Sequence, residues 1–412
     1  MTAVRRATSA TFIAFGASGL AFASLFARIP QIRDQLHLDP AGLGLTLLSG
    51  SAGSVLALIL SGPVVARFGS RRVVQVSAVL FAVGLATAAF GALVGVPPVV
   101  AGLFVLGVGT GAWDVAMNLQ GTTVERHLDR TIMSRLHAGF SVGTVVGALV
   151  GAAMVALKVP VAVHLTAIAV LVATVVPGYA RRFLPDRAEP GAPAARTGFG
   201  AWREPRTILI GLFVLAFTLA EGAGNDWIVI ASVDGHQAAP AIGTLAFAAF
   251  LTAMTIGRWC GPWLLHRYGK VPVLRALAVT GLAGTALFVF APVLPLALAG
   301  ALLWGLGAAL GFPVGMSAAA EDPDRAAGRV SVVATIGYCA FLAGPPLLGL
   351  LGDQITVLRA LMAVAVLFGF AALLTGVSLG GRATATDVPP DGSTDADGHG
   401  AETSAPRAVD RA

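Results

Sequence analysis

The chain has 412 residues, of which 56% are hydrophobic and only 12% are charged, and this composition excludes an ordinary soluble enzyme of the same length. The formal net charge is +6, but a nucleic-acid-binding role would need a soluble domain or a basic patch interleaved with aromatic residues, and the sequence contains neither. The composition therefore indicates a protein that resides in a lipid bilayer and has no nucleic-acid partner.

Uncharged apolar runs recur along most of the chain. About 20 such residues cross a hydrocarbon core that is ~30 Å thick. Two runs, 73–113 and 276–320, are each roughly twice that length and are interrupted by prolines at 97–98 and 292–295, so each predicts two helices joined by a tight turn. The other predicted spans cover residues 7–27, 41–66, 136–157, 159–180, 207–233, 240–265, 330–352 and 360–379. The sequence thus predicts an all-α, polytopic membrane protein with twelve transmembrane helices.

The positions of the basic residues predict the orientation, because short loops rich in Lys and Arg stay cytoplasmic. With the amino terminus inside, only Arg28, Arg33, Lys158 and Arg359 fall in outer loops. Arg258 lies within a span, and every other Lys and Arg is on the inner side. The positive charge therefore reports topology and contact with an anionic inner leaflet. We expect a monomeric multi-pass protein of the cytoplasmic membrane with both termini in the cytoplasm.

The termini and the cysteines carry weaker signals. Two arginines near the amino terminus, an apolar run and AFAS at 21–24 are similar to a cleavable signal peptide, but eleven further spans favour a retained first helix. The last 31 residues, from Arg382, are polar and rich in Asp, Thr, Gly and Pro, which predicts a disordered cytoplasmic tail. Cys260 and Cys339 lie within spans without metal-ligand spacing, so we expect no metal, disulfide or cofactor.

An internal repeat organises the chain. SGPVVARFGSRR at 61–72 returns as GPWLLHRYGK at 261–270, an offset of 200, and glycines ahead of GAWDVAMN return ahead of GFPVGM at an offset of 198. The aligned pairs are Arg67 and Arg267, Gly69 and Gly269, Gly107 and Gly305, and Gly109 and Gly307. Parallel duplication of six spans is the arrangement in which a substrate site forms between the halves near the middle of the membrane. The expected divisions are 1–180, the linker 181–206, 207–380 and the tail 381–412.

At these residues a family resemblance is evident. The Gly62, Arg67, Gly69 and Arg71 pattern between spans two and three resembles the signature loop of the major facilitator superfamily. The stretches WDVAMNLQGTTVERH, MSRLHAGFSVG, AEGAGNDW and GYCAFLAGPPLLG are similar to the bacterial branch typified by YbjJ and MosC, near sugar and cyclitol carriers. The resemblance covers about residues 8–380. It implies two pseudo-symmetric six-helix bundles, alternating access and a bacterial inner membrane.

The loop between spans two and three departs from the family pattern at one position. The family usually has an acid just before the first arginine, where this chain has Ala66 and, in the repeat, His266. We therefore expect Arg67 and Arg71 to pair with an acid at the inner end of span four, such as Glu125. The candidate gating residues are Gly62, Arg67, Gly69, Arg71, Glu125, Arg258, Arg267 and Gly269; Arg258 is included for its depth in span eight, which is comparable with that of Asp114.

Span four carries two polar residues, Asp114 and Asn118, one helical turn apart on one face. An acid at the centre of a membrane helix costs ~2.5 to 3.5 kcal/mol on insertion scales, and such residues usually face a cavity or a partner. One interpretation is a cavity wall, where Asp114 takes up a proton or binds substrate hydroxyls. The other is a structural lock, where Asp114 pairs with Arg258 or with an arginine of the inner loops. Both interpretations stay open.

Span seven carries the matching feature, Glu221 with Asn225 one turn further on the same face. Glycines 222 and 224 predict a loosened helix, where free backbone groups meet ligand or water. Glu221 is the first candidate for the proton carrier, and the alternative is a hydrogen bond that only stabilises the helix. Asp226 and Trp227 are expected near the outer interface, where Trp227 either anchors the span or stacks on substrate.

The leading hypothesis is a proton-coupled secondary transporter of a small polar solute, sugar-like or cyclitol-like. The sequence has no GxxxxGK[ST] loop for a primary pump, and its scattered His and Cys do not form an enzyme site. Drug or metabolite efflux is the first alternative, although span five lacks the proline of the exporter signature, and a non-transporting solute sensor is the second. The candidate substrate-binding residues are Asp114, Asn118, Ser141, Glu221, Asn225, Trp227 and Tyr338, of which Glu221 and Asp114 are also the proton-coupling candidates.

Overall fold

The computed structural model describes residues 2–130, 132–186, 199–322 and 325–379, and this part of the chain is helical without any β-strand. The first bundle is built from α1 (Thr2–Phe26), α2 (Ile29–Leu36), α3 (Pro40–Gly91), α4 (Val96–Leu128), α5 (Met133–Ala156) and α6 (Val161–Ala180). The second is built from η1 (Phe199–Arg203), α7 (Pro205–Ile230), the π-helical turn η2 (Ala231–Gly235), α8 (Pro240–Tyr268), α9 (Lys270–Phe290), α10 (Leu294–Ala308), α11 (Gly311–Ala319), α12 (Ala326–Ile355), α13 (Val357–Ala360) and α14 (Met362–Leu379). The predicted tail from Arg382 lies outside the described residues.

Eleven helical runs in the described chain are long and apolar enough to cross a membrane. One of them, α3, has 52 residues and bends at Gly69, where the backbone has φ 79° and ψ 154°. A helix of this length rises ~78 Å, far more than one crossing of the membrane needs. The helix α3 therefore supplies two crossings, one before and one after Gly69. With α3 counted as two crossings, the eleven runs give twelve transmembrane helices, which agrees with the number predicted from the sequence.

The two long apolar runs break at the predicted prolines. The first run breaks between Gly91 and Val96, and Pro97 sits in the first turn of α4. The second breaks after Phe290, and Pro295 sits in the first turn of α10. Proline is accepted there because the first amides of a helix have no intrahelical partner to lose.

The sequence repeat is also a repeat of backbone geometry. Gly269 between α8 and α9 has φ 83° and ψ 164°, close to the values at Gly69. The helix crossings repeat as well, because a Cβ at Gly107 would overlap the carbonyl oxygen of Gly50, and a Cβ at Gly305 would overlap that of Phe250. Both halves therefore use glycine at the same positions to bring helices into backbone contact.

Replacing Gly69 or Gly269 with Ala is expected to lower the stability of the protein. Positive φ with ψ near 160° is a region that essentially only glycine occupies, so each substitution should cost about 1 to 3 kcal/mol. Thermal unfolding of the purified protein measures this loss. Gly62→Ala is the matched control, since a Cβ there meets no atom within 4 Å, and equal melting temperatures for all three variants would contradict the prediction.

The predicted loosening of span seven at Gly222 and Gly224 is wrong. The helix α7 continues unbroken through both glycines. Gly224 serves packing, since a Cβ there would overlap the ring of Phe250. The break lies instead in span ten, between Ala308 and Gly311, where α10 ends and α11 begins. Gly311 is required there because a Cβ would overlap the ring of Phe217 on α7.

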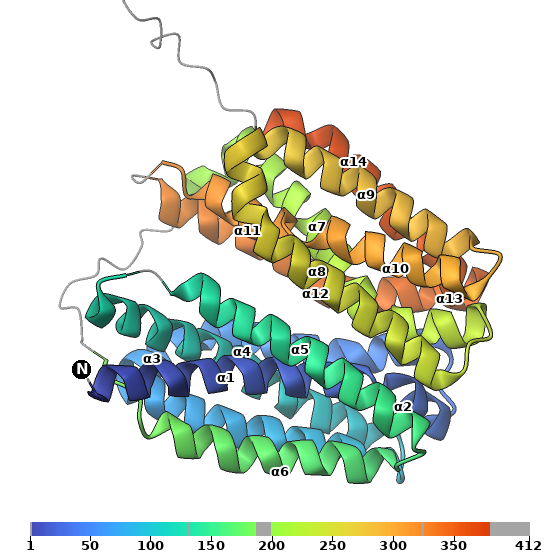
Figure 1. The fold of residues 1–412 in the computed structure, drawn as a ribbon, viewed down its shortest axis with the longest axis horizontal. Helices are drawn as coiled ribbons and strands as arrows, with labels where there is room; N and C mark the ends of the chain where they lie inside the picture. The colour runs from blue at the N-terminus through green and yellow to red at the C-terminus, as the bar shows by residue number, and fades with distance from the viewer. Residues whose placement is uncertain (1, 131, 187–198, 323–324, 380–412) are drawn as a thin grey trace, which may run out of the picture. The chain divides into compact units, whose positions relative to one another are not determined.

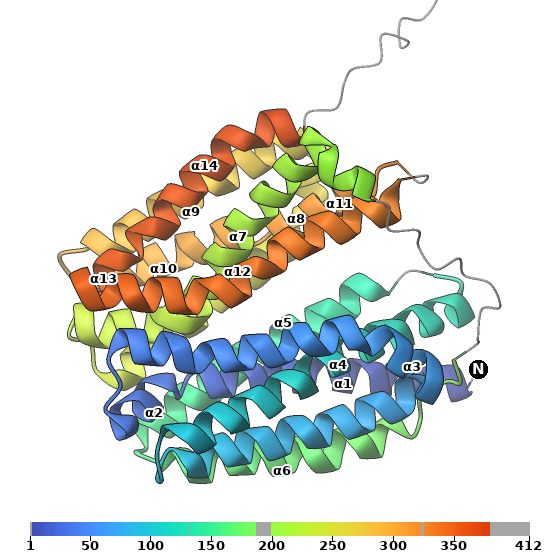
Figure 2. The same cartoon turned by 180° about the vertical axis from the view of Figure 1, so that it is seen from behind.

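The two bundles converge at the end where α2 and α13 lie and diverge towards the end where α1 begins (Figures 1 and 2). At the converging end, which we call the closed end, Arg33 of α2 forms an ion pair with Asp234 of η2. A Cβ at Gly44 of α3 would overlap the carbonyl oxygen of Pro345 of α12, so the helices cross there in backbone contact. The closed end is thus sealed by charge and by close packing.

At the diverging end, which we call the wide end, the ion pairs that join described residues lie within the second bundle. Glu204, just before α7, accepts a hydrogen bond of 2.6 Å from Nε of Arg329 on α12. This bond holds the pKa of Glu204 below its ordinary value. A carboxylate with a lowered pKa stabilises the fold above its unfolded pKa and loses that effect as pH falls through the folded value, so this contact should weaken only in acid.

Candidate functional site

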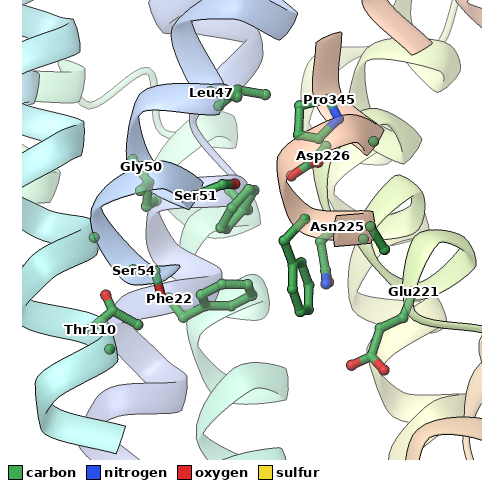
Figure 3. A pocket seen from close by; sticks show the side chains of 18 of the residues that line it. Phe22, Leu47, Gly50, Ser51, Ser54, Thr110, Glu221, Asn225, Asp226 and Pro345 are labelled. Carbon is green, nitrogen blue, oxygen red and sulfur yellow. The ribbon is translucent and has the colours of Figure 1, made fainter. Parts of the chain in front are cut away.

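A cavity of about 330 Å³ lies between the two bundles. Its walls come from α1, α3, α4 and α5 on one side and from α7, α8 and α12 on the other. Figure 3 shows Phe22, Ser51 and Ser54 facing Asn225 and Asp226 across it. Because its two walls belong to different bundles, any rocking of the bundles must change the shape of this cavity.

The wall of the first bundle is lined by hydroxyls and aromatic rings. Ser51 and Ser54 are three residues apart on α3 and share one face, and Ser18 on α1 and Thr110 on α4 add two more hydroxyls. Phe22 of α1 directs its ring into the space beside them (Figure 3). Such a wall offers hydrogen bonds to substrate hydroxyls next to a flat apolar surface.

The wall of the second bundle is richer in acceptors. Asn225 of α7 is only 7% exposed, and its Oδ1 has no hydrogen-bond partner in the described chain. Asp226 follows it on the cavity wall, and Tyr338 and Phe341 of α12 complete this side. A buried unpaired acceptor is costly, so a ligand that donates a hydrogen bond to Asn225 would remove that cost.

Glu221 also lines the cavity, but its carboxylate is already engaged. Nη2 of Arg258 on α8 lies 2.8 Å from Oε1 and 2.9 Å from Oε2 of Glu221. Nε of the same arginine lies 3.3 Å from the carbonyl oxygen of Ala309, at the break in span ten. Arg258 therefore ties α7, α8 and the α10–α11 junction together, and a proton on Glu221 would compete with this guanidinium.

Asp114 has a different environment. Its side chain is exposed to the cavity and accepts a 3.2 Å hydrogen bond from Nδ2 of Asn118. His137 of α5 and Tyr338 of α12 lie within electrostatic range of its carboxylate. The proposed lock between Asp114 and Arg258 is wrong, because Glu221 takes the guanidinium instead. Within the described residues, Asp114 forms no ion pair at short range.

The structure brings four of the seven predicted substrate-binding residues together on the cavity wall: Asp114, Glu221, Asn225 and Tyr338. Asn118 does not line the cavity but holds Asp114 from one turn away. Ser141 is buried on α5 and does not line it either, whereas Thr144, three residues later, does. The wall hydroxyls of Ser18, Ser51, Ser54 and Thr110 are absent from the predicted set.

Neither of the two roles expected for Trp227 is observed. Trp227 is 0% exposed and packs in the core of the second bundle, so it neither anchors in an aromatic belt nor lines the cavity. Asp226 lines the cavity. The reason is that the closed end covers this part of α7, through the contacts of η2 with α2 and α13.

The predicted pairing of Glu125 with Arg67 or Arg71 is not observed among the described residues. Oε1 of Glu125 instead accepts backbone hydrogen bonds from Ile132 (2.6 Å) and Met133 (2.7 Å), so it caps the amino-terminal end of α5. The guanidinium carbon of Arg67 lies 5.5 Å from the centre of the Phe68 ring. In the repeat, Arg267 lies at the same distance from the centre of the Tyr268 ring.

Asp186, which follows α6, takes the place expected of Glu125. Its carboxylate accepts hydrogen bonds from the amide and the hydroxyl of Ser70, directly after the Gly69 bend. A carboxylate of the segment after α6, within the predicted linker 181–206, thus stabilises the signature loop through Ser70. The gating roles of Gly62, Arg67, Gly69, Arg71, Glu125, Arg258, Arg267 and Gly269 remain proposals.

Comparison with known protein families identifies the architecture. The model of the Major Facilitator Superfamily matches residues 11–341. The chain belongs to the major facilitator superfamily. It is therefore a multi-pass membrane transporter of this superfamily. The apolar spans and the signature loop in the sequence had predicted this assignment.

Relatives and solved structures agree with this membership. The chain is 30% identical to an uncharacterized transporter of Sinorhizobium fredii, y4wD, over 87% of this chain and 95% of the relative. It is 28% identical to the membrane protein MosC of Rhizobium meliloti, over 84% of both chains. The structure is similar to the nucleoside transporter NupG (TM-score 0.71, 15% identity, 92% and 98% covered) and to the fucose:proton symporter FucP of E. coli (0.61, 16%, 90% and 98%). These two likenesses show the shared fold of this superfamily.

Proposed function

We propose that this transporter moves a small polar solute with several hydroxyl groups, of the sugar or cyclitol class, by alternating access coupled to protons. The observation that carries the proposal is the cavity, where hydroxyls of one bundle face the carboxylate of Asp226 and the amide oxygen of Asn225, which has no hydrogen-bond partner among the described residues. Sugar hydroxyls both donate and accept, so they match Ser51 and Ser54 as well as Asn225 and Asp226. The ring of Phe22 suits the apolar C–H face of such a solute.

We assign the wide end to the cytoplasm of a bacterial inner membrane, so both termini are cytoplasmic and the described state is inward-open. Support comes from the loops at this end, which carry most of the Lys and Arg. The two transport units in this proposal are residues 1–180 and 207–380, with 181–206 as a linker, in a monomer. Residues 187–198 of that linker and the tail 381–412 lie outside the described residues.

Asp114 is our leading proton carrier, with Glu221 second. A carrier must exchange its proton with the cavity in one state, and Asp114 is exposed there without a short-range cation partner among the described residues. Glu221 would first have to release Arg258. Asn118 already donates a hydrogen bond to the Asp114 carboxylate, and its amide oxygen could accept one from the protonated acid. His137 and Tyr338 lie within electrostatic range of the same carboxylate.

Asp114→Asn is expected to keep solute exchange and to lose proton-driven accumulation. The amide preserves the shape and the bond to Asn118 but cannot take up a proton. Proteoliposomes measure both properties, counterflow without a gradient and uptake driven by a pH gradient. Accumulation should fall by at least about tenfold, which corresponds to ~1.4 kcal/mol of lost coupling.

Asp353→Asn is the matched control for this experiment. Asp353 is an exposed acid near the end of α12 and does not line the cavity. Its variant should accumulate solute like the parent protein. Undiminished accumulation by Asp114→Asn would show that Asp114 is not the carrier, and loss of both counterflow and accumulation would make Asp114 a substrate ligand instead.

A further inference from the structure

A second cavity of about 300 Å³ lies at the closed end, away from the substrate cavity. Arg28, Gln31 and Gln35 line it from the segment around α2, and the turn between α5 and α6 lines the opposite side with Lys158. Pro240, the first residue of α8, contributes from the second bundle. Both bundles therefore touch this space.

Arg28 is the main polar group of this cavity and is only 2% exposed. Its Nη2 donates a 2.6 Å hydrogen bond to the carbonyl oxygen of Val159. Its Nε and Nη1 are buried and have no hydrogen-bond partner in the described chain. A buried guanidinium with unpaired donors destabilises the protein unless an anion or strong acceptors satisfy it.

The groups around Arg28 add positive charge and hydrogen-bonding capacity. Lys158 is exposed at the rim, and Gln31 directs a buried amide oxygen without a partner into the same region, where rotation of the amide would present its NH₂ group. Of the acids near this end, Asp34 and Asp234 pair with Arg33, and Asp39 accepts a hydrogen bond from the amide of Gly42. Within the described residues, no carboxylate neutralises Arg28.

We propose that this cavity is an oxyanion-binding site that takes a phosphate group, either of a phospholipid headgroup or of a free phosphate. Phosphate oxygens are strong hydrogen-bond acceptors, and their negative charge would balance the positive charges of Arg28 and Lys158. Water would satisfy the unpaired donors but not the charge. The exposed rim at Lys158 and Gln35 leaves an entrance from the surface.

The site has a conformational consequence, because it is complete only while the bundles are closed at this end. Pro240 belongs to the second bundle, and the other lining residues belong to the first. A ligand that contacts both bundles binds this state better than the state in which they separate. Binding should therefore favour the state that is open at the wide end. This inference does not depend on the identity of the transported solute.

Two measurements test the site and distinguish the two sources of phosphate. In a phosphate-free detergent, thermal unfolding of the full protein is followed with increasing inorganic phosphate. In parallel, native mass spectrometry counts the phospholipids that remain bound after purification. The variants are Arg28→Gln, Lys158→Gln and Arg359→Gln; Arg359 is the control, an exposed arginine of α13 at the same end but outside the cavity.

We expect Arg28→Gln to lose at least about tenfold in phosphate affinity, or to lose a phospholipid that the parent retains, because it removes a buried charged donor. Lys158→Gln should weaken phosphate binding about two- to fivefold, since Lys158 is exposed. This variant tests the site even if Arg28→Gln does not fold. Arg359→Gln should behave like the parent. Phosphate stabilisation alone identifies a free anion, and phospholipid retention alone identifies a headgroup. Equal phosphate affinity and equal lipid retention in the parent, Lys158→Gln and Arg359→Gln would overturn the proposal, as would a parent that binds neither.

Discussion

Arg258→Met is expected to be the most damaging substitution beside the cavity, where Arg258 pairs with the wall residue Glu221. It leaves the Glu221 carboxylate without its partner and frees the carbonyl oxygen of Ala309 at the break in span ten. Breaking one partner of a largely buried ion pair costs about 3 to 5 kcal/mol. We therefore expect a large drop in thermal stability and a loss of counterflow, both measured on the purified and reconstituted protein.

A double-mutant cycle separates the pair from its surroundings. Glu221→Gln combined with Arg258→Met should recover part of the stability that Arg258→Met loses, because the double variant leaves no unpaired charge. Lys270→Met is the matched control, since its pair with Glu321 is exposed and should contribute less than about 1 kcal/mol. A loss for Arg258→Met no larger than that for Lys270→Met would show that the Glu221–Arg258 pair does not hold α7, α8 and span ten together.

Gly349→Ala is expected to prevent the closed end from closing and so to slow transport. A Cβ at Gly349 on α12 would overlap the carbonyl oxygen of Pro40 on α3, and these residues belong to different bundles. Overpacking costs typically 1 to 3 kcal/mol, so the ratio of the closed to the open population at this end should fall about 5- to 150-fold. Counterflow measures the lost turnover, and labelling of a cysteine introduced at Ser51 from the closed side measures the opening.

Two further alanine variants show whether the effect is conformational. Gly107→Ala overlaps Gly50 within the first bundle, where rocking cannot relieve the overlap, so it should lower the melting temperature. Gly349→Ala should leave the melting temperature nearly unchanged, because separation of the bundles removes its overlap. Gly178→Ala meets no atom within 4 Å and should match the parent in every measurement. Normal counterflow and labelling with Gly349→Ala would contradict the role of this crossing.

Much of the fold could be predicted because its signals are local. An uncharged run of sufficient length identifies a span, and the prolines near 97 and 295 identify the turns that divide the two long runs. The repeat aligned Gly69 with Gly269, and the backbone has a positive φ at both residues. The break in span ten was not predictable in this way, because it depends on Gly311 meeting Phe217 of another helix.

The site could be predicted only in part, because polar residues signal their presence and not their partners. Asp114 and Glu221 stand out in apolar spans, and both line the cavity. Which acid receives Arg258 depends on how α7 and α8 face each other, and that is a property of the assembled bundle. Ser51 and Ser54 were missed because a hydroxyl costs little in a membrane helix and can bond to its own backbone.

The environment of Trp227 also depends on contacts that the sequence does not show. A tryptophan near the end of a span usually lies in the aromatic belt, so its position in the sequence predicted an interface. In the structure it is 0% exposed, because that part of α7 is enclosed by its own bundle at the closed end. The enclosure comes from contacts between segments far apart in the sequence, such as Gly235 of η2 with Leu358 of α13.

The central claim, that a hydroxyl-rich solute passes through the cavity between the bundles, is tested most directly by counterflow in proteoliposomes. The panel contains sugars, cyclitols, nucleosides, amino acids and apolar drugs, and the parent is compared with Ser54→Trp, which fills the hydroxyl-lined wall. We predict that at least one hydroxyl-rich solute exchanges in the parent and that Ser54→Trp abolishes this exchange while it keeps the parent's melting temperature. Exchange of apolar drugs alone, no exchange at all, or exchange that survives in Ser54→Trp would contradict the claim.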